Sequence, residues 1–121
     1  MSESFKTNPH LIALISDLKA KTRENEEAAI WRDIALRLEK PKRNWAEANL
    51  SKLERYAQDG ETIIVPGKVL AAGSVTKKLT VAAYDFSDAA AAGIKAAGGE
   101  TMTIRELMEN NPKGSGVRIM R

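Results

Sequence analysis

Lysine and arginine are the side chains whose types and spacing could carry a function in this chain. Residues 40–55 hold five of them against two acidic residues, residues 63–84 hold three against none, and residues 113–121 hold three against none. A cationic side chain can neutralise a phosphate, and several on one rigid domain can bind a folded polyanion. The pattern therefore indicates nucleic-acid binding, although alternating charge is also typical of an ordinary solvated surface.

The segment Lys40–Trp45 (KPKRNW) brings several suitable side chains together in a loop. Pro41 ends the preceding helical pattern, so Lys42 and Arg43 are free to reach backbone phosphates. Trp45 can stack on a base or a sugar. It can equally fold back onto the core, and the sequence leaves both interpretations open.

Other chemistries lack the residues they need. The chain has no cysteine and one histidine, His10, which excludes disulfides, thiolate metal sites and most transition-metal ligand sets. Gly67-Lys68 fails as a phosphate-binding P-loop, because the preceding glycine is too far upstream and Val69 stands where a magnesium-binding Ser or Thr is required. No paired carboxylates or nucleophile–base pair stand out. We therefore expect neither an enzyme nor a cofactor.

Two amphipathic helices are expected near the N-terminus. The first should begin with Thr7 or Asn8 as its N-cap and Pro9 in the first turn. The second should span residues 26–39, where Pro41 stops it. Their apolar stripes are Leu11, Leu14, Ile15 and Leu18, widened by Ile12, and Ile30, Trp31, Ile34, Ala35 and Leu38. Trp31 at this spacing is expected in the core rather than on a nucleic acid.

The stretch 61–87 is the expected centre of the fold. Residues 62–65 form a continuous apolar run typical of a strand covered on both faces, which Pro66-Gly67 then interrupts. Residues 79–83 predict a second strand, with its odd-numbered side chains on one face. Lys68, Lys77 and Lys78 are expected at the turns beside these strands, giving an apolar centre with a cationic rim.

Short helices should surround this centre. Ser51 and Glu54 fit a capping box that opens a short helix. Lys52 and Arg55 are three residues apart in this helix and should project together. Residues 88–97 predict a lean, Ala-rich helix, with Ser87 as N-cap and a glycine pair at its end. A second capping box, Thr103 with Glu106, opens another helix. In the tail, Val117 and Ile119 can dock on one side while Arg118 faces the other.

The bulk composition predicts one domain over residues 1–121, because the length and a hydrophobic fraction of 43% suffice for a modest core. Residues 1–6 are expected to be loose, and residues 113–121 form a basic C-terminal tail. No apolar run is long enough for a membrane span, and the first residues lack a signal-peptide pattern.

Several of these stretches, in order and at matching spacing, resemble one protein family. They are Asn8-Pro9, Ile30-Trp31, Pro41, Asn49-Leu50-Ser51-Lys52, Thr62–Leu70 (TIIVPGKVL), Val81-Ala82-Ala83, Phe86-Ser87, Ala97-Gly98-Gly99 and Asn111–Val117 (NPKGSGV). They are similar to the archaeal and eukaryotic large-subunit ribosomal proteins called eighteen-e, a family related to bacterial ribosomal protein fifteen. Family members usually have Gly in place of Ala72 and commonly Val in place of Ala48. The compact length resembles archaeal members.

The resemblance implies an α/β fold, in which a small irregular strand-strand-helix core has the N-terminal helices packed beside it. It implies a non-catalytic, structural constituent of the large ribosomal subunit in the cytoplasm. The implied partners are large-subunit ribosomal RNA and neighbouring ribosomal proteins, with no membrane and no small-molecule substrate.

The side chains to which the resemblance and the charge pattern together assign RNA contact lie in the loop, the short helix, the strand turns and the tail. They are Lys42, Arg43, Lys52, Arg55, Lys68, Lys77, Lys78, Lys113, Arg118 and Arg121. Asn49 is a further candidate, either for RNA contact or for capping the local turn. The expected mechanism is phosphate neutralisation with recognition of RNA shape rather than base reading.

A protein–protein adaptor in another ribonucleoprotein complex is the alternative function. The lean helix over residues 88–97 and the acidic stretch 85–112 would then form its contact surface.

Overall fold

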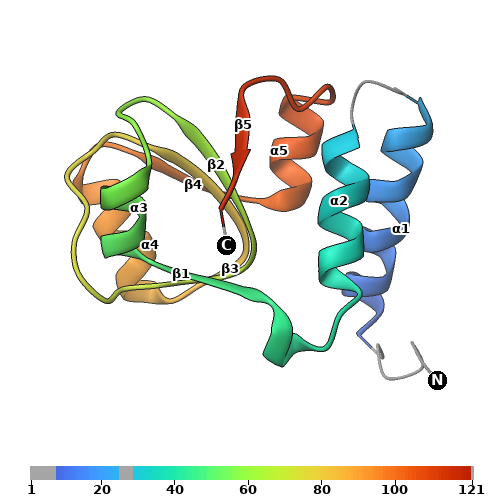
Figure 1. The fold of residues 1–121 in the computed structure, drawn as a ribbon, viewed down its shortest axis with the longest axis horizontal. Helices are drawn as coiled ribbons and strands as arrows, with labels where there is room; N and C mark the ends of the chain where they lie inside the picture. Colours follow the sequence, from blue (N-terminus) through green and yellow to red (C-terminus); the bar gives the residue numbers. More distant parts are fainter. Residues whose placement is uncertain (1–7, 25–28, 121) are drawn as a thin grey trace.

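The computed structural model describes residues 8–24 and 29–120. The expected loose segment 1–6, the expected start of the second helix at Glu26, and Arg121 lie outside these residues. Helices α1 (Pro9–Glu24) and α2 (Ala29–Leu38) lie side by side at one end of the molecule (Figure 1). Asn8 is the N-cap of α1, since its Oδ1 accepts hydrogen bonds from the backbone N–H groups of His10 at 2.9 Å and Leu11 at 3.4 Å. The predicted apolar stripes of both helices are buried apart from Ile30, which is half-buried, and Ile12, which is exposed; the expectation that Ile12 widens the stripe was wrong, because it points away from α2 and the sheet into solvent.

The centre of the molecule is a five-stranded sheet in which every pairing is parallel. Its strands are β1 (Ala46–Asn49), β2 (Thr62–Leu70), β3 (Thr80–Phe86), β4 (Glu100–Thr103) and β5 (Val117–Ile119). Their order is β1-β2-β3-β4, and β5 pairs with the first residues of β2. Because β3 occupies one edge of β2, β1 and β5 share its other edge.

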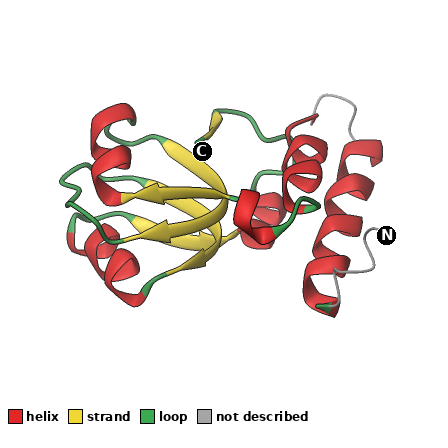
Figure 2. Cartoon of the chain, turned by 60° about the horizontal axis from the view of Figure 1, so that its bottom comes forward, coloured by secondary structure: helices red, strands yellow, loops and turns green. Residues whose placement is uncertain are grey.

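Helices cover both faces of the sheet (Figure 2). Helices α1, α2 and α5 (Ile104–Asn110) pack on the face that presents Ile64 and Ala82. Helices α3 (Leu50–Tyr56) and α4 (Asp88–Ala96) pack on the face that presents Ile63, Val65 and Val81. The predicted α/β class, with the N-terminal helices beside a central core, is confirmed.

The sheet is larger than the sequence indicates. Pro66 and Gly67 do not interrupt β2, which continues through them to Leu70; the β2–β3 register shifts instead between Val65 and Lys68. Strand β3 likewise runs on to Phe86. Strands β1 and β4 were not predicted, because each is four residues long and neither has the apolar run that marks a covered strand.

The predicted helix caps have different outcomes. Ser87 caps α4 through its Oγ, and Thr103 with Glu106 forms the expected capping box of α5. The capping box at Ser51 was wrong, because α3 already begins at Leu50 with Asn49 at the N-cap position. Glu54 cannot close such a box, since its carboxylate accepts hydrogen bonds from Thr76, a residue distant in sequence.

The C-terminal segment is held against the body of the protein. Val117 and Ile119 pack toward the α1–α2 side, as predicted from their alternation. Arg118 projects to the opposite face and reaches α3. The indole of Trp31, fully buried as expected, donates a hydrogen bond of 2.7 Å to the carbonyl of Pro112. The chain leading into β5 is therefore anchored on α2. Among the described helices, none is long and apolar enough to cross a membrane.

We predict that Gly67→Ala lowers the free energy of unfolding by about 1–3 kcal/mol, because a Cβ at this position would collide with the backbone of Ala46 and force β1 away from β2. Lys68→Ala on the same strand, where the side chain is exposed, is the control and should stay within about 0.5 kcal/mol of the parent chain. Urea unfolding followed by circular dichroism measures both changes. Equal stability of the two variants would contradict the proposed close approach.

Candidate nucleic-acid interface

The basic loop is ordered by its own tryptophan. Lys42 and Arg43 lie exposed on a short 3-10 helix, η2 (Lys42–Asn44), which connects α2 to β1. The indole N–H of Trp45 donates to the carbonyl of Lys40 at 2.9 Å, and its ring meets Tyr84 edge-on at 4.9 Å between ring centroids. The ammonium of Lys42 lies 5.7 Å from the Trp45 ring centroid. Trp45 is therefore half-buried against the helical core and supports the loop.

A hollow of about 260 Å³ lies beside this loop, where β1, β2 and β3 run together. Lys42 and Lys68 line it, and so do Glu47 and Asp85. The strand register places Glu47, Lys68 and Asp85 in one row, with Lys68 Nζ 3.9 Å from an Asp85 oxygen. Lys68 thus lies within β2, and its expected position at a turn was wrong. Residues 63–84 contain no acidic side chain, but the sheet places Glu47 and Asp85 from neighbouring strands beside Lys68.

Helix α3 presents a cationic face with an aromatic ring. Its buried side holds Leu50 and Leu53. Lys52, Arg55 and Tyr56 lie three and four residues apart, so they project on the same side of the helix. Together with Ser51 they line a shallow groove. Tyr56 was not among the residues that the sequence analysis singled out, although it lies four residues from Lys52 on the same side of the helix.

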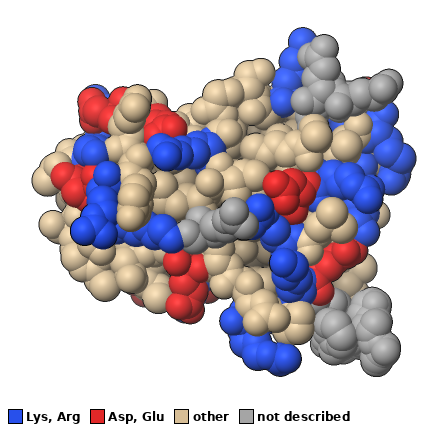
Figure 3. Space-filling view, viewed as in Figure 1, with Lys and Arg blue, Asp and Glu red and all other residues tan. Residues whose placement is uncertain are grey.

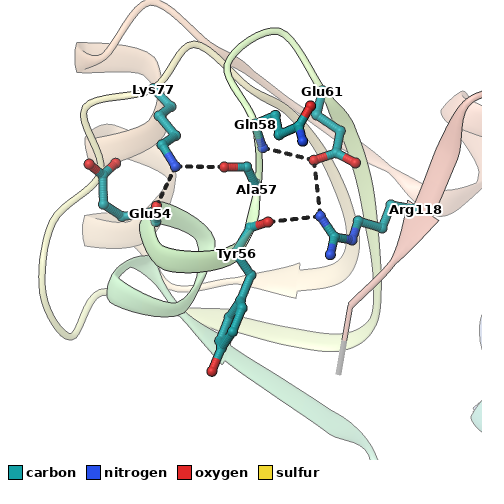
Figure 4. Close-up of polar contacts among 7 residues, drawn as sticks. All are labelled: Glu54, Tyr56, Ala57, Gln58, Glu61, Lys77 and Arg118. Carbon is teal, nitrogen blue, oxygen red and sulfur yellow. Dashed lines mark hydrogen bonds and ion pairs between the residues drawn. The ribbon is translucent and has the colours of Figure 1, made fainter.

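Two cations from elsewhere in the chain bind the carbonyl groups at the end of α3 (Figure 4). Lys77 Nζ donates to the carbonyls of Glu54 and Ala57, each at 2.6 Å. A guanidinium N–H of Arg118 donates to the carbonyl of Tyr56 at 2.8 Å and lies 3.4 Å from Glu61. The last carbonyls of a helix have no partner within it and carry partial negative charge, so cations are favourable there. Lys77 and Arg118, predicted as RNA contacts, therefore also have structural partners.

Glu54 is held by Thr76 and does not line the groove. Its carboxylate accepts hydrogen bonds of 2.8 Å from both the backbone N–H and the hydroxyl of Thr76. The N–H and hydroxyl of Thr76, followed by the nearby charge of Lys77, lower the pKa of Glu54 from its ordinary value of 4.5. The carboxylate therefore stays ionised and bound to Thr76 at neutral pH.

The other predicted cations differ in their surroundings. Arg43, Lys78 and Lys113 are exposed, and their side chains make no hydrogen bond or ion pair with the described residues. Lys52 is half-buried and interacts within the chain. Asn49 is exposed, and its side chain makes no capping hydrogen bond. Arg121 lies outside the described residues.

The structure therefore does not gather the predicted residues into a single patch. Figure 3 shows Lys and Arg side chains over α3 at the left, near η2 at the bottom and over the α1–α2 pair at the right, with acidic side chains between them. The predicted cations that lie together are Lys42 with Lys68 and Lys52 with Arg55. In addition, Lys77 and Arg118 both bind the end of α3. Over residues 8–24 and 29–120, no cluster of three or more His, Asp or Glu side chains could hold a metal ion.

Known proteins match this chain over nearly its whole length. Residues 4–121 match the family model described as "Ribosomal protein 60S L18 and 50S L18e". The chain is similar to the large ribosomal subunit protein eL18 of Methanoregula boonei, with 60% identity over 96% of this chain and 95% of that protein. The eL18 proteins of Archaeoglobus fulgidus and Haloarcula marismortui are each 52% identical, over 95% and 96% of this chain and 97% and 98% of their own lengths.

We expect Lys77→Met to lower the free energy of unfolding by about 1–3 kcal/mol, because the carbonyls of Glu54 and Ala57 lose their common donor. Its neighbour supplies a matched control. Lys78→Met removes the same charge from an exposed side chain and should change stability by less than about 0.5 kcal/mol. Urea denaturation of both variants decides the matter, and equal losses would mean that the carbonyl contacts contribute nothing.

The lowered pKa of Glu54 predicts a pH-dependent contribution to stability. The hydrogen bonding to Thr76 is fully present above pH 4.5 and disappears as the pH falls through the lowered pKa of the folded state. Glu54→Gln should therefore unfold at a lower urea concentration than the parent chain at pH 7, and this difference should shrink as the pH falls below 4.5. Glu109→Gln, at an exposed site, should show no such convergence. A difference that is independent of pH would contradict this assignment.

Proposed function

The chain belongs to the family of ribosomal proteins that comprises 60S L18 and 50S L18e, and from this premise we propose that it binds large-subunit ribosomal RNA through cations held on a rigid α/β domain. Membership makes the chain a structural protein of the large ribosomal subunit, at work in translation in the cytoplasm. The expectation that it is not an enzyme is confirmed by the family. The contacts that it makes with RNA belong to the proposal.

The geometry of the η2 loop is the observation that carries the proposal. Lys42 and Arg43 are exposed on a short helix whose position is fixed by Trp45. Arg43 makes no ion pair with the described residues, so its guanidinium can bind phosphate without giving up a protein partner. Loop ordering before binding also reduces the entropic cost of association. Phosphate neutralisation then releases counterions from the RNA.

The remaining cations are proposed to act in different ways. Exposed Lys78 and Lys113 can bind phosphates directly, as can Lys52 and Arg55 at the groove on α3. Lys68 should bind phosphate more weakly, because Asp85 and Glu47 already offset its positive charge. Asn49, Lys77, Arg118 and Arg121 were also predicted as contacts, and we keep Asn49 and Arg121 as proposed ones. Lys77 and Arg118 would have to leave or share their carbonyl partners.

The whole chain is proposed to act as one RNA-binding domain. The helices on the two faces pack on the same sheet, and the C-terminal segment is paired with its central strand. A unit of this kind presents its cations at fixed distances from one another. Neighbouring proteins of the large subunit are proposed as further partners, in keeping with the family.

We predict that Lys42→Glu combined with Arg43→Glu leaves the fold intact but impairs incorporation into large-subunit particles. Two attractive interactions with phosphates become repulsive, and the slope of log K against log salt should flatten by about 0.7–0.9 for each phosphate that is no longer neutralised. Sucrose-gradient sedimentation of tagged protein measures incorporation, and circular dichroism checks the fold.

A variant with Arg23→Glu and Lys95→Glu is the matched control for charge. Both side chains are exposed on helices away from the loop, and the total change in charge is the same. It should enter particles better than the loop variant. Normal incorporation of the loop variant would contradict the proposed role of η2.

A further inference from the structure

We propose that Tyr56 stacks on an unpaired base of the ribosomal RNA, while Lys52 and Arg55 bind the phosphates beside that base. The inference rests on the proposed RNA-binding function and adds a base-stacking site on α3 to the phosphate contacts. It also gives Lys77 and Arg118 a definite part, as positioning residues that hold this site in place.

The exposure of Tyr56 is the first observation. Tyr56 is 51% exposed, whereas Trp31 is fully buried and Trp45 packs on the half-buried Tyr84. Among the Phe, Tyr and Trp residues within 8–24 and 29–120, it is the one whose side chain lies open to solvent. An aromatic face kept in water is available for stacking, and any of the four bases can stack on it.

The charge around the ring is the second observation. The groove beside Tyr56 is lined by Ser51, Lys52 and Arg55, and no acidic side chain is among its lining residues. The Arg55 guanidinium lies 5.8 Å from the centroid of the Tyr56 ring. Glu54, the acidic residue of α3, binds Thr76 on another side of the helix and so does not neutralise the groove. A flat ring flanked by two cations fits a base with its attached phosphates.

The fixed backbone beneath the ring is the third observation. Arg118 binds the carbonyl of Tyr56 itself, and Lys77 binds the carbonyls of Glu54 and Ala57. Glu61 accepts a hydrogen bond from the backbone of Gln58 at 2.9 Å and also contacts Arg118. In Figure 4 these contacts lie on one side of the backbone, and the Tyr56 ring points away from them. The helix end is thus held before any ligand arrives, which lowers the entropic cost of binding.

These observations favour RNA over a protein as the occupant. A protein partner would need acidic side chains to match Lys52 and Arg55, and it would gain little from a single ring on an open, shallow groove. A nucleotide supplies a planar face and a negative charge within one unit. The tyrosine hydroxyl makes no hydrogen bond with the described residues, so the ring and the hydroxyl are both open to a ligand, and the variant Tyr56→Phe separates their contributions.

The test is filter binding of the full chain to transcribed archaeal large-subunit ribosomal RNA over a range of potassium chloride concentrations. Tyr56→Ala should weaken binding about 5- to 150-fold, because one base loses its stacking partner. The salt slope should not change, since every phosphate keeps its cation. Tyr56→Phe keeps the ring and should bind within about twofold of the parent chain. Arg55→Gln should flatten the slope by about 0.7–0.9 instead.

Each contrary result has a distinct meaning. Parental affinity of Tyr56→Ala would overturn the stacking site, and weak binding by the Lys42→Glu, Arg43→Glu variant would show that the proposed function survives. Parental affinity of both variants would overturn both proposed sites, and failure of the parent chain itself to bind would count against RNA binding as a whole. If Tyr56→Ala bound naked RNA normally but entered particles poorly, a neighbouring protein would be the occupant and the stacking proposal would be wrong.

The positioning role is tested with Lys77. Lys77→Met should weaken RNA binding with an unchanged salt slope, and Lys77→Arg, which keeps a donor for the carbonyls, should restore part of the affinity. Thermal unfolding confirms that each variant is folded at the temperature of the assay. A slope that flattens by about 0.7–0.9 in Lys77→Met would mean that Lys77 itself binds a phosphate, and the positioning role would be overturned.

Discussion

The enclosure of β2 is the constraint on which the rest of the structure depends. Residues 63–67 of this strand are buried in succession, which requires neighbouring strands on both edges and helices on both faces. One edge must accept two short strands, β1 and β5, end to end. Gly67 allows the backbone of β1 to approach there. Within the described residues the core contains no buried charged group, so every cation is left at the surface.

Surface cations are not equivalent, and the fold divides them by what lies nearby. Lys77 and Arg118 are drawn to the carbonyl end of α3, where unpaired backbone groups carry partial negative charge. Lys68 meets carboxylates across neighbouring strands. Arg43 and Lys113 have no such partner in the described part of the chain. A count of cations within one segment of the sequence therefore overstates the positive charge available to a polyanion. The fold brings acidic side chains and carbonyl groups from distant segments beside these cations.

The sequence predicted those elements whose signal lies within a short stretch of the chain. Periodic apolar residues identified α1 and α2, and side-chain caps identified the starts of α4 and α5. Strands β1 and β4 are stabilised by pairing with β2 and β3 rather than by their own composition, so no local signal marks them. The same limit explains the failure at Ser51, where the expected partner Glu54 binds Thr76 instead. The RNA-binding candidates could be named from charge, but their partners depend on tertiary contacts.

The position of β1 connects the fold to the proposed interface. Its four residues separate the cations of η2 from those of α3, a span of about 13 Å in an extended strand. Hydrogen bonding to β2 keeps this span fixed, and Trp45 on one side and Leu50 on the other anchor its ends in the two cores. The loop and the helix face are thus held as two cationic sites on one rigid spacer. Such an arrangement favours an RNA surface whose phosphates already have a matching separation, which is recognition of shape rather than of sequence.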